Sequence, residues 1–240
     1  MPMKLHLLGV NGPFPESRGA TSGYLLEAGD SLLQFDLGSG VLAALTALTA
    51  PESMTALFLS HWHFDHAADV PVLMYRLQAC GKTLPVYGPA DPSSPLYQLV
   101  NAVPCFSFTE IAAGQTLCIG SAEITVTAAR HPVPAVGFRV SCGGRTFGYT
   151  GDTNTLPSLA EDYRGCDLLL ADGLFPRDAW AEAKPHLSAE LAAQLARDAG
   201  AGKLIVTHLN PFFPRRTLLE EARAVFPHTQ LAEAGAAAEI

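Results

Sequence analysis

The sequence has few charged residues and no apolar run long enough to cross a membrane. Charged residues make up 16% of the 240 residues, with 15 Lys and Arg against 23 Asp and Glu. The formal net charge of -8 disfavours extended contact with nucleic acid, because clustered Lys and Arg supply most of that affinity. The longest nearly unbroken apolar stretch, residues 41–50, is about half the roughly 20 residues of a membrane span. We therefore predict neither a membrane nor an extended nucleic acid as partner.

Cysteine is also scarce and unpatterned. The five cysteines are odd in number, well separated and without a Cys-x-x-Cys pair; they are Cys80, Cys105, Cys118, Cys142 and Cys166. This spacing argues against a disulfide framework and a cysteine-based zinc site, and it predicts buried free thiols. The amino-terminal residues lack the long apolar region of a secretory signal, which predicts a cytoplasmic location.

The pattern of strands and helices predicts one layered domain spanning residues 1–240. A chain of this length can form a single core, and its hydrophobic fraction of 48% suits a compact fold. The first group of predicted strands covers residues 4–10, 22–38 as a hairpin, 55–60 and 84–89, with helices at 41–49, 67–79 and 94–102. The second covers strands at 122–129, 136–142, 146–152, 166–175 and 203–211, with helices at 188–200 and 217–226. Two such groups, each flanked by helices, predict a four-layer αββα sandwich.

The most informative segment is "HWHFDH", residues 61–66, which follows a short buried strand. On an extended loop, residues i and i+2 can face one centre, so His61 and His63 can share a metal ion. Asp65 and His66 then reach a second position. Two metals about 3.5 to 4 Å apart need a ligand that touches both, and a carboxylate suits that role. Asp152 in "TGDT" is the candidate bridge.

Two further histidines stand at predicted strand ends. His131 in "ARHPVP" and His208 in "VTHLNP" are each followed by a proline within two residues. A lone histidine of this kind is usually a surface or hydrogen-bonded structural residue. The neighbouring hexapeptide reverses that expectation, because a purely structural role would give three imidazoles and a carboxylate no chemical use. We therefore predict that both histidines are metal ligands.

These motifs resemble the metallo-β-lactamase superfamily, whose His-x-His-x-Asp-His signature stands here as "HWHFDH". The resemblance extends from "FDLGSG" through "TGDT" to "THLNP". It implies an αββα sandwich with a dinuclear site at one edge of the sheets, and it suggests a homodimer. The implied ligands are His61, His63 and His131 for one metal, Asp65, His66 and His208 for the other, and Asp152 as the bridge. Imidazole and carboxylate ligands favour two zinc ions, with Mn2+ or Fe2+ as alternatives.

Two stretches resemble the ribonuclease Z and small phosphodiesterase branch. They are "RHPVPAVGFRV" and "KPHLSAELAAQLARDAGAGKLIVTHLNP". Only twenty residues separate His131 from Asp152, too few for the long tRNA-grasping arm of ribonuclease Z. We therefore expect a metal-dependent hydrolase that cleaves a small or cyclic phosphodiester with a metal-bridging hydroxide. The alternatives are a thioester or lactone hydrolase similar to hydroxyacylglutathione hydrolase, an arm-less tRNA 3′ processing endonuclease-like protein, and a non-enzymatic or redox member.

The candidate catalytic residues are Asp65, also a predicted ligand, together with His186 and Asp172. His186 in "KPHLS" could stabilise the transition state or protonate the leaving alkoxide. Its alternative role is a helix-entry histidine beside the predicted Ser188 cap. Asp172 could orient His186, or it could form a strand-end turn with Gly173.

Three more residues have two open interpretations each. Asp36 either supports the metal site from behind or ends its hairpin as a turn residue. Arg215 and Arg216 either meet a substrate phosphate or are solvated surface charges. His6 and His228 have no partner pattern, so we assign them no function.

Overall fold

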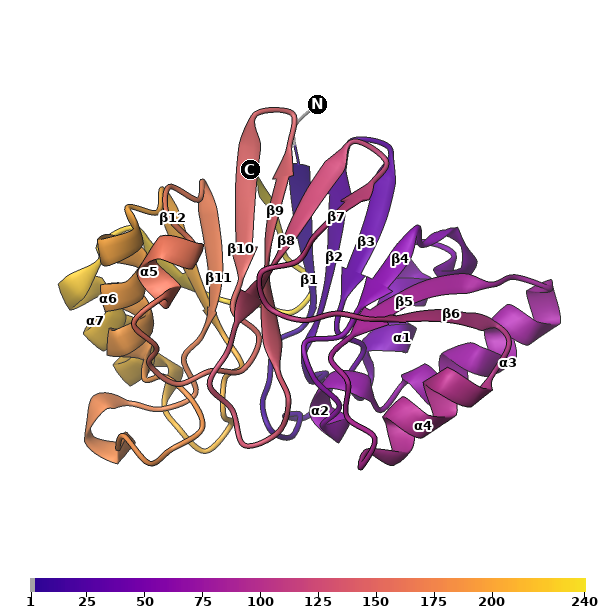
Figure 1. The fold of residues 1–240 in the computed structure, drawn as a ribbon. Coiled ribbons are helices and arrows are strands. Elements are labelled where there is room, and N and C mark those ends of the chain that lie inside the picture. The colour runs from indigo at the N-terminus through magenta and orange to yellow at the C-terminus, as the bar shows by residue number, and fades with distance from the viewer. Residues whose placement is uncertain (1–2) are drawn as a thin grey trace.

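Two seven-stranded sheets pack face to face at the centre of the computed structural model, which describes residues 3–240 (Figure 1). The first sheet has the order β14-β1-β2-β3-β4-β5-β6, and the second has the order β13-β12-β11-β10-β9-β8-β7. The first sheet comprises β1 Met3–Gly9, β2 Gly23–Ala28, β3 Ser31–Phe35, β4 Ala56–Phe58, β5 Leu84–Gly88, β6 Phe106–Glu110 and β14 Ala237–Glu239. The second comprises β7 Thr116–Ile119, β8 Ala122–Ala128, β9 Val136–Cys142, β10 Arg145–Tyr149, β11 Leu168–Asp172, β12 Lys203–Thr207 and β13 Thr229–Leu231.

Helices cover the outer face of each sheet. Buried side chains of α1 Val41–Leu48, α3 Val70–Cys80 and α4 Pro95–Ala102 share one apolar cluster with the first sheet. Those of α5 Leu159–Asp162, α6 Ala189–Ala199 and α7 Arg215–Val225 share another with the second sheet. The short elements are α2 Phe64–Ala67 and the 3-10 turns η1 Pro51–Ser53 and η2 Arg177–Ala179. The predicted αββα sandwich is confirmed (Figure 1).

Apolar side chains of both inner faces fill the space between the sheets. The ring of Phe35 in β3 lies 5.3 Å from that of Phe138 in β9 and 6.0 Å from that of Phe147 in β10. All three rings are fully buried. Burying each such side chain stabilises the fold by about 1.5–3 kcal/mol, so this cluster holds the two sheets together.

Parallel strand pairs bring the chemically distinctive residues to one edge. β3 is parallel to β4, and β10, β11 and β12 are parallel to one another. The carboxyl ends of these strands lie at the lower edge in Figure 1, where α2 is labelled. Residues that follow parallel strands meet at such an edge. The side chains that gather there are Asp36, His61, Asp152, Asp172 and His208.

Most predicted elements are present, and the differences have local causes. Gly143 and Gly144, between β9 and β10, have the positive φ values that a tight hairpin turn requires, 59° and 80°. The helix predicted over 67–79 begins only at Val70, because a separate turn, α2, precedes it. The strands β6, β7, β13 and β14 lie outside the predicted strand ranges, and all four are at sheet edges. β13 and β14 have only three residues each, and the polar residues of β6 and β7 are largely exposed.

The five thiols are free, as predicted, but only three of them are buried. Cys105, Cys142 and Cys166 lie in the interior. Cys80 is exposed because it ends α3, and Cys118 is exposed because it lies on the outward-facing side of the edge strand β7. Within residues 3–240, none of the helices combines the length and apolar character that crossing a bilayer requires.

Candidate metal centre

All seven predicted ligands lie together at the lower edge of the sandwich. They form two groups whose ligand atoms lie within 4.8 Å of one another: His61, His63 and His131 in one, and Asp65, His66, Asp152 and His208 in the other. Asp152 faces both groups, since its Oδ2 lies 3.7 Å from His61 Nε2 and its Oδ1 lies 3.2 Å from His66 Nε2. The arrangement therefore offers two adjacent cation positions with one carboxylate between them.

The spacing of the first group suits a tetrahedral ion. His63 Nδ1 lies 3.0 Å from His61 Nε2 and 3.2 Å from His131 Nε2. Ligands about 2.0 Å from a tetrahedral zinc ion stand about 3.3 Å from one another. The three nitrogens thus already have nearly the separation that a shared ion imposes.

Polar groups behind the histidines turn the free ring nitrogens toward the centre. Asp36 Oδ2 accepts a hydrogen bond from His66 Nδ1 at 2.7 Å, and Ser22 Oγ lies 3.1 Å from His208 Nδ1. The opposite nitrogens, His66 Nε2 and His208 Nε2, are buried without a hydrogen-bond partner among residues 3–240. Such orphaned atoms are costly unless a ligand satisfies them. A cation would satisfy them, so the residues present fit a metal.

The electrostatics of most ligands favour the same conclusion. His66 is the exception, because burial lowers its pKa but Asp152, Asp36 and Asp65 outweigh burial and raise it well above its usual range, so a metal must displace a proton there. Burial, with help from neighbouring imidazoles, holds the pKa of His61 and His208 well below the usual range, and burial lowers the pKa of His131 to about 4. Burial raises the pKa of Asp152, but His208 and His66 outweigh it and hold this pKa well below its usual range. Neutral imidazoles and an ionised carboxylate are the forms that bind metals, and this oxygen and nitrogen set suits a divalent cation.

His186 and Asp172 form a buried pair beside Asp152. Asp172 Oδ2 accepts a hydrogen bond from His186 Nδ1 at 2.9 Å, and His186 Nδ1 lies 3.7 Å from Asp152 Oδ2. Burial lowers the pKa of His186, but the carboxylates of Asp172 and Asp152 raise it to about 9. Burial raises the pKa of Asp172 to about 6. Between these values the pair is ionic, so His186 is a proton-bearing acid although it lies within reach of a metal ligand set.

The alternative structural role of His186 is only partly borne out. Ser188 does cap α6, because its Oγ accepts a hydrogen bond from Leu191 N at 3.1 Å. The ring of His186, however, stacks on that of His208 with centroids 4.9 Å apart. Asp172 accepts further hydrogen bonds from the backbone nitrogens of Thr153 and Leu174. It thus serves a turn and the histidine together.

The sequence and the fold of this chain are both similar to those of known proteins. The family model described as the Beta-lactamase superfamily domain matches residues 23–209. The chain belongs to the metallo-β-lactamase superfamily. A probable metallo-hydrolase of Bacillus subtilis (strain 168), YhfI, is 34% identical over 230 residues, which cover 93% of this chain and 94% of the relative. The crystal structure of YhfI has a TM-score of 0.94 at 33% identity, with both chains covered in full.

Two further similarities are more distant. A ribonuclease Z of Methanosarcina acetivorans is 25% identical over 293 residues, with 96% of each chain covered. A crystal structure described as a new diphosphatase from the PhnP family has a TM-score of 0.80 at 17% identity and covers 100% of this chain and 98% of that one. The second similarity shows a shared fold.

A polar network lies behind the ligands of the candidate metal centre, and the sequence predicted it only in part. Asp36 is fully buried, and its carboxylate accepts hydrogen bonds from Ser60 N at 2.7 Å, Ser60 Oγ at 2.8 Å and Tyr149 Oη at 2.5 Å, besides that from His66. Asp36 thus supports the site from behind, which is the first of its two interpretations. Ser22, Ser60 and Tyr149 were missed, although the place of Ser60 directly before His61 was an available signal.

Two residues of the centre have a backbone conformation that favours glycine. Asp36 has a φ of 55° and His208 a φ of 57°. For residues with a side chain, such conformations cost on the order of 1–3 kcal/mol and persist only where the surroundings enforce them. Both residues directly follow strands, β3 and β12, so each turns its side chain sharply toward the centre.

Replacing Tyr149 with Phe is expected to weaken zinc binding by about 10- to 100-fold, because Asp36 would lose a donor and hold His66 less firmly. Competition titration against a chromophoric zinc chelator measures this affinity. The matched control is Tyr163→Phe, which removes an equally buried hydroxyl that contacts Thr127 and the Tyr149 carbonyl but not Asp36. Equal zinc affinities in the two variants would contradict the role of Tyr149.

His186 should also make the stability of the metal-free protein depend on pH. Its folded pKa of about 9 exceeds its ordinary value of 6.5, so its stabilisation is complete below pH 6.5 and disappears as the pH rises through 9. In chelator, wild type should melt about 5 °C above His186→Gln at pH 6.5, and the two should converge near pH 10. Thermal unfolding followed by circular dichroism measures the difference. A constant difference across that range would refute the charged pair.

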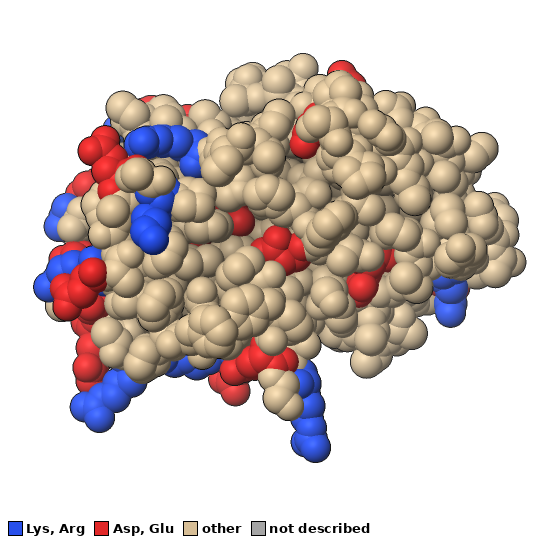
Figure 2. Space-filling model, turned by 90° about the horizontal axis from the view of Figure 1, so that it is seen from below, with Lys and Arg blue, Asp and Glu red and all other residues tan. Residues whose placement is uncertain are grey.

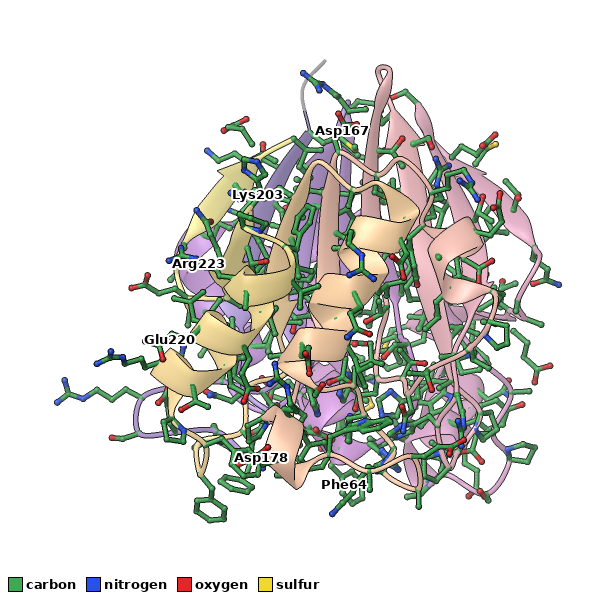
Figure 3. All side chains as sticks on the ribbon, turned by 90° about the vertical axis from the view of Figure 1, so that its left-hand side faces the viewer. Phe64, Asp167, Asp178, Lys203, Glu220 and Arg223 are labelled. Atoms are coloured by element: carbon green, nitrogen blue, oxygen red, sulfur yellow. The ribbon has the colours of Figure 1, made fainter. Side chains whose placement is uncertain are left out.

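The two arginines near the last helix do not reach the metal centre. Arg215 forms an ion pair with Glu16 and donates to the Ala232 carbonyl at 3.2 Å. Arg216 pairs with Glu220, which Figure 3 shows projecting from α7. The surface-charge interpretation of both residues is the one that these contacts support.

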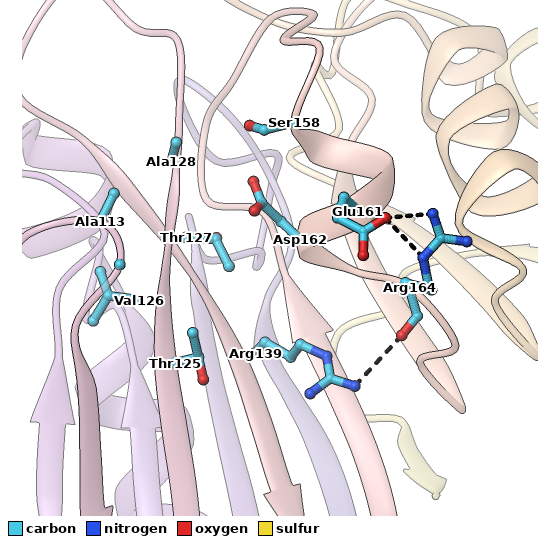
Figure 4. Close-up of a pocket in the computed structure, with 11 residues that line it drawn as sticks. Ala113, Thr125, Val126, Thr127, Ala128, Arg139, Ser158, Glu161, Asp162 and Arg164 are labelled. Atoms are coloured by element: carbon cyan, nitrogen blue, oxygen red, sulfur yellow. Dashed lines mark hydrogen bonds and ion pairs between the residues drawn. The ribbon is translucent and has the colours of Figure 1, made fainter.

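The hollow between β8 and α5 is not a second centre of the same kind. Its arginines already have partners, since Arg164 pairs with Glu161 and Arg139 donates to the Arg164 carbonyl (Figure 4), whereas Asp162 Oδ2 is buried without a hydrogen-bond partner among residues 3–240. None of the seven predicted ligands lines it. We therefore assign the chemistry to the metal centre.

Proposed function

We propose that this metallo-β-lactamase superfamily protein is a zinc-dependent hydrolase of a small or cyclic phosphodiester. The His186–Asp172 pair carries the proposal, because it sets a protonated imidazole beside the carboxylate that faces both cation positions. A phosphodiester leaves as a poor alkoxide, which needs a proton in the transition state. The similar proteins described as a probable metallo-hydrolase and a ribonuclease Z agree with this class.

Each residue has a defined task in this reaction. When bound, two divalent cations supply Lewis acidity, lower the pKa of a water molecule and neutralise charge on the phosphoryl oxygens. The ligands of the two groups fix the positions of the cations, and Asp152 faces both. Asp172 holds His186 through Nδ1, so that the proton on Nε2 remains available to the leaving oxygen. Asp65 Oδ2 lies 3.7 Å from Nε2 of His66 and from Nε2 of His208, a place that suits its proposed roles as a ligand and as a catalytic residue.

Two observations favour a small substrate over tRNA. The residues between His131 and Asp152 are taken up by the β9–β10 hairpin, which leaves no segment for a binding arm there. On the face that contains the centre, carboxylates lie in the central hollow and Lys and Arg lie near the margins (Figure 2). A phosphate backbone would find little positive charge across this face.

Hydrolysis of bis(p-nitrophenyl) phosphate by zinc- and manganese-loaded protein tests the proposal, with a glutathione thioester assayed in parallel. We expect metal-dependent turnover of the diester and little turnover of the thioester. Clear thioester cleavage without diester cleavage would show that the centre is hydrolytic but that the phosphodiesterase assignment is wrong. Inactivity of the metal-replete protein toward both would reject the hydrolase itself.

A further inference from the structure

Aromatic rings extend outward from the metal centre along one side. His186 stacks on His208, Phe175 lies with its ring centroid 6.1 Å from that of His186, and Phe213 lies 6.0 Å from Phe175. These rings belong to two segments that follow β11 and β12. They connect the proposed acid to the surface through side chains that are only partly buried.

The file of rings continues on a third segment. Phe212 is 80% exposed, and its ring lies 4.8 Å from that of Phe14. The segment with Phe14 is held against the centre, because a Cβ on Gly12 would lie 2.1 Å from Cε1 of His208. We call Phe14, Phe175, Phe212 and Phe213 the aromatic wall. It starts beside a metal ligand and ends in solvent.

A further exposed aromatic side chain lies at this end of the molecule. Phe64, which directly precedes the ligand Asp65, is 66% exposed, and Figure 3 shows it at the same end as Asp178 of η2. Large exposed apolar side chains are isolated on most soluble proteins, and groups of them mark binding surfaces. Phenyl faces bind planar groups by stacking, and they do so with little dependence on sequence or charge.

A lysine lies over one ring of the wall. Lys184 Nζ lies 5.3 Å from the centroid of the Phe175 ring, on the segment that carries His186. This ammonium group offers a positive charge to an anionic group of a ligand that lies against the rings. The wall therefore differs from a base-free sugar phosphate site, in which hydroxyl groups would need hydrogen-bonding side chains rather than phenyl rings.

We infer that the aromatic wall binds a planar heteroaromatic group of the substrate, so that the phosphodiester cleaved is nucleotide-like rather than a base-free sugar phosphate. The inference rests on the proposed phosphodiesterase function and specifies its substrate class. A base stacked on the wall would place its attached phosphate toward His186, because the rings of Phe213 and Phe175 lead to that residue.

Binding and turnover test the wall separately. Calorimetry of the metal-loaded protein compares AMP with ribose 5-phosphate, and kinetics compare adenosine 2′,3′-cyclic phosphate with glycerol 1,2-cyclic phosphate. Wild type should bind AMP and cleave the adenosine ester with at least about 10-fold preference. Phe212→Ser and Phe213→Leu should reduce AMP affinity and that preference by about 5- to 100-fold, with the base-free compounds unchanged. The matched control is Tyr75→Ser, since Tyr75 is 66% exposed on α3, outside the wall.

The outcomes separate this inference from the proposal beneath it. Turnover of bis(p-nitrophenyl) phosphate with no preference for AMP over ribose 5-phosphate would overturn only the inference that the aromatic wall binds a base. The proposed phosphodiesterase function would stand. Absence of both turnover and phosphate-monoester binding would overturn the phosphodiesterase. Sedimentation provides one further check: if Phe212→Ser converts a dimer to a monomer and leaves the base preference intact, the ring belongs to a subunit interface and the inference is wrong.

Discussion

Replacing Asp152 with Ala should lower kcat/KM for bis(p-nitrophenyl) phosphate by about 10³- to 10⁵-fold and reduce bound zinc below two ions per chain. The carboxylate lies within 3.7 Å of imidazole nitrogens of His61, His66 and His208 and faces both cation positions. Two bound cations would then lack the carboxylate that faces both of their positions and offsets their mutual repulsion. Since a metal contributes several kcal/mol to the transition state, loss of one ion alone accounts for this effect. Steady-state kinetics and elemental analysis of dialysed protein measure the two quantities.

The control for this variant is Asp198→Asn, which removes an exposed carboxylate of α6 that pairs only with Arg197. It should retain wild-type activity and metal content. Thermal unfolding in chelator shows whether Asp152→Ala still folds. A folded Asp152→Ala protein that keeps two zinc ions and near-wild-type kcat/KM would refute the bridging role.

Replacing His186 with Ala should reduce kcat by about 10²- to 10⁴-fold on a diester with an alkyl leaving group, while both metal ions remain bound. The loss should be much smaller on bis(p-nitrophenyl) phosphate, because p-nitrophenolate is stable enough to leave without a proton. Stopped assays on a matched pair of methyl and p-nitrophenyl esters measure the difference. Asp172→Asn should show the same dependence on leaving group with a smaller loss, since His186 would keep its ring but lose its anionic partner.

Equal losses on the two esters would mean that His186 does not supply the proton. Loss of metal in His186→Ala would instead make it a ligand, which its place in a group with His131 and Asp152 allows. Elemental analysis distinguishes the two results, because only the second changes the amount of bound metal.

The metal ligands were predictable from sequence because their chemistry is rare and their positions are regular. Histidine and aspartate directly after buried strands have few structural reasons to be there, and parallel strands carry such residues to a common edge. His208 illustrates this, because it directly follows the parallel strand β12, whereas His131 stands three residues beyond the antiparallel strand β8. Both were predicted as ligands only because the hexapeptide at 61–66 is present. The αββα arrangement followed from the alternation of strand and helix patterns in two groups.

The supporting residues were not predictable for the opposite reason. Serine and tyrosine occur throughout the chain, and Tyr149 reaches Asp36 across 113 positions of sequence and from the other sheet. Ser22 meets His208 across 186 positions. No local pattern encodes contacts of this kind. The aromatic wall was missed likewise, because its members come from three separate segments whose proximity only the fold establishes.

The division of the ligands between the two sheets has a mechanical consequence. His61, His63, Asp65 and His66 follow a strand of the first sheet, whereas His131, Asp152 and His208 follow strands of the second. Two bound metal ions would therefore cross-link the two sheets at one end of the sandwich, while the phenylalanine core holds the sheets together at the middle. Cleaving the chain between β6 and β7 would leave each fragment with an incomplete set of donors. Reassembly of the fragments would then depend on zinc. The zinc concentration needed for reassembly would measure how strongly the metal cross-link stabilises the association of the two sheets.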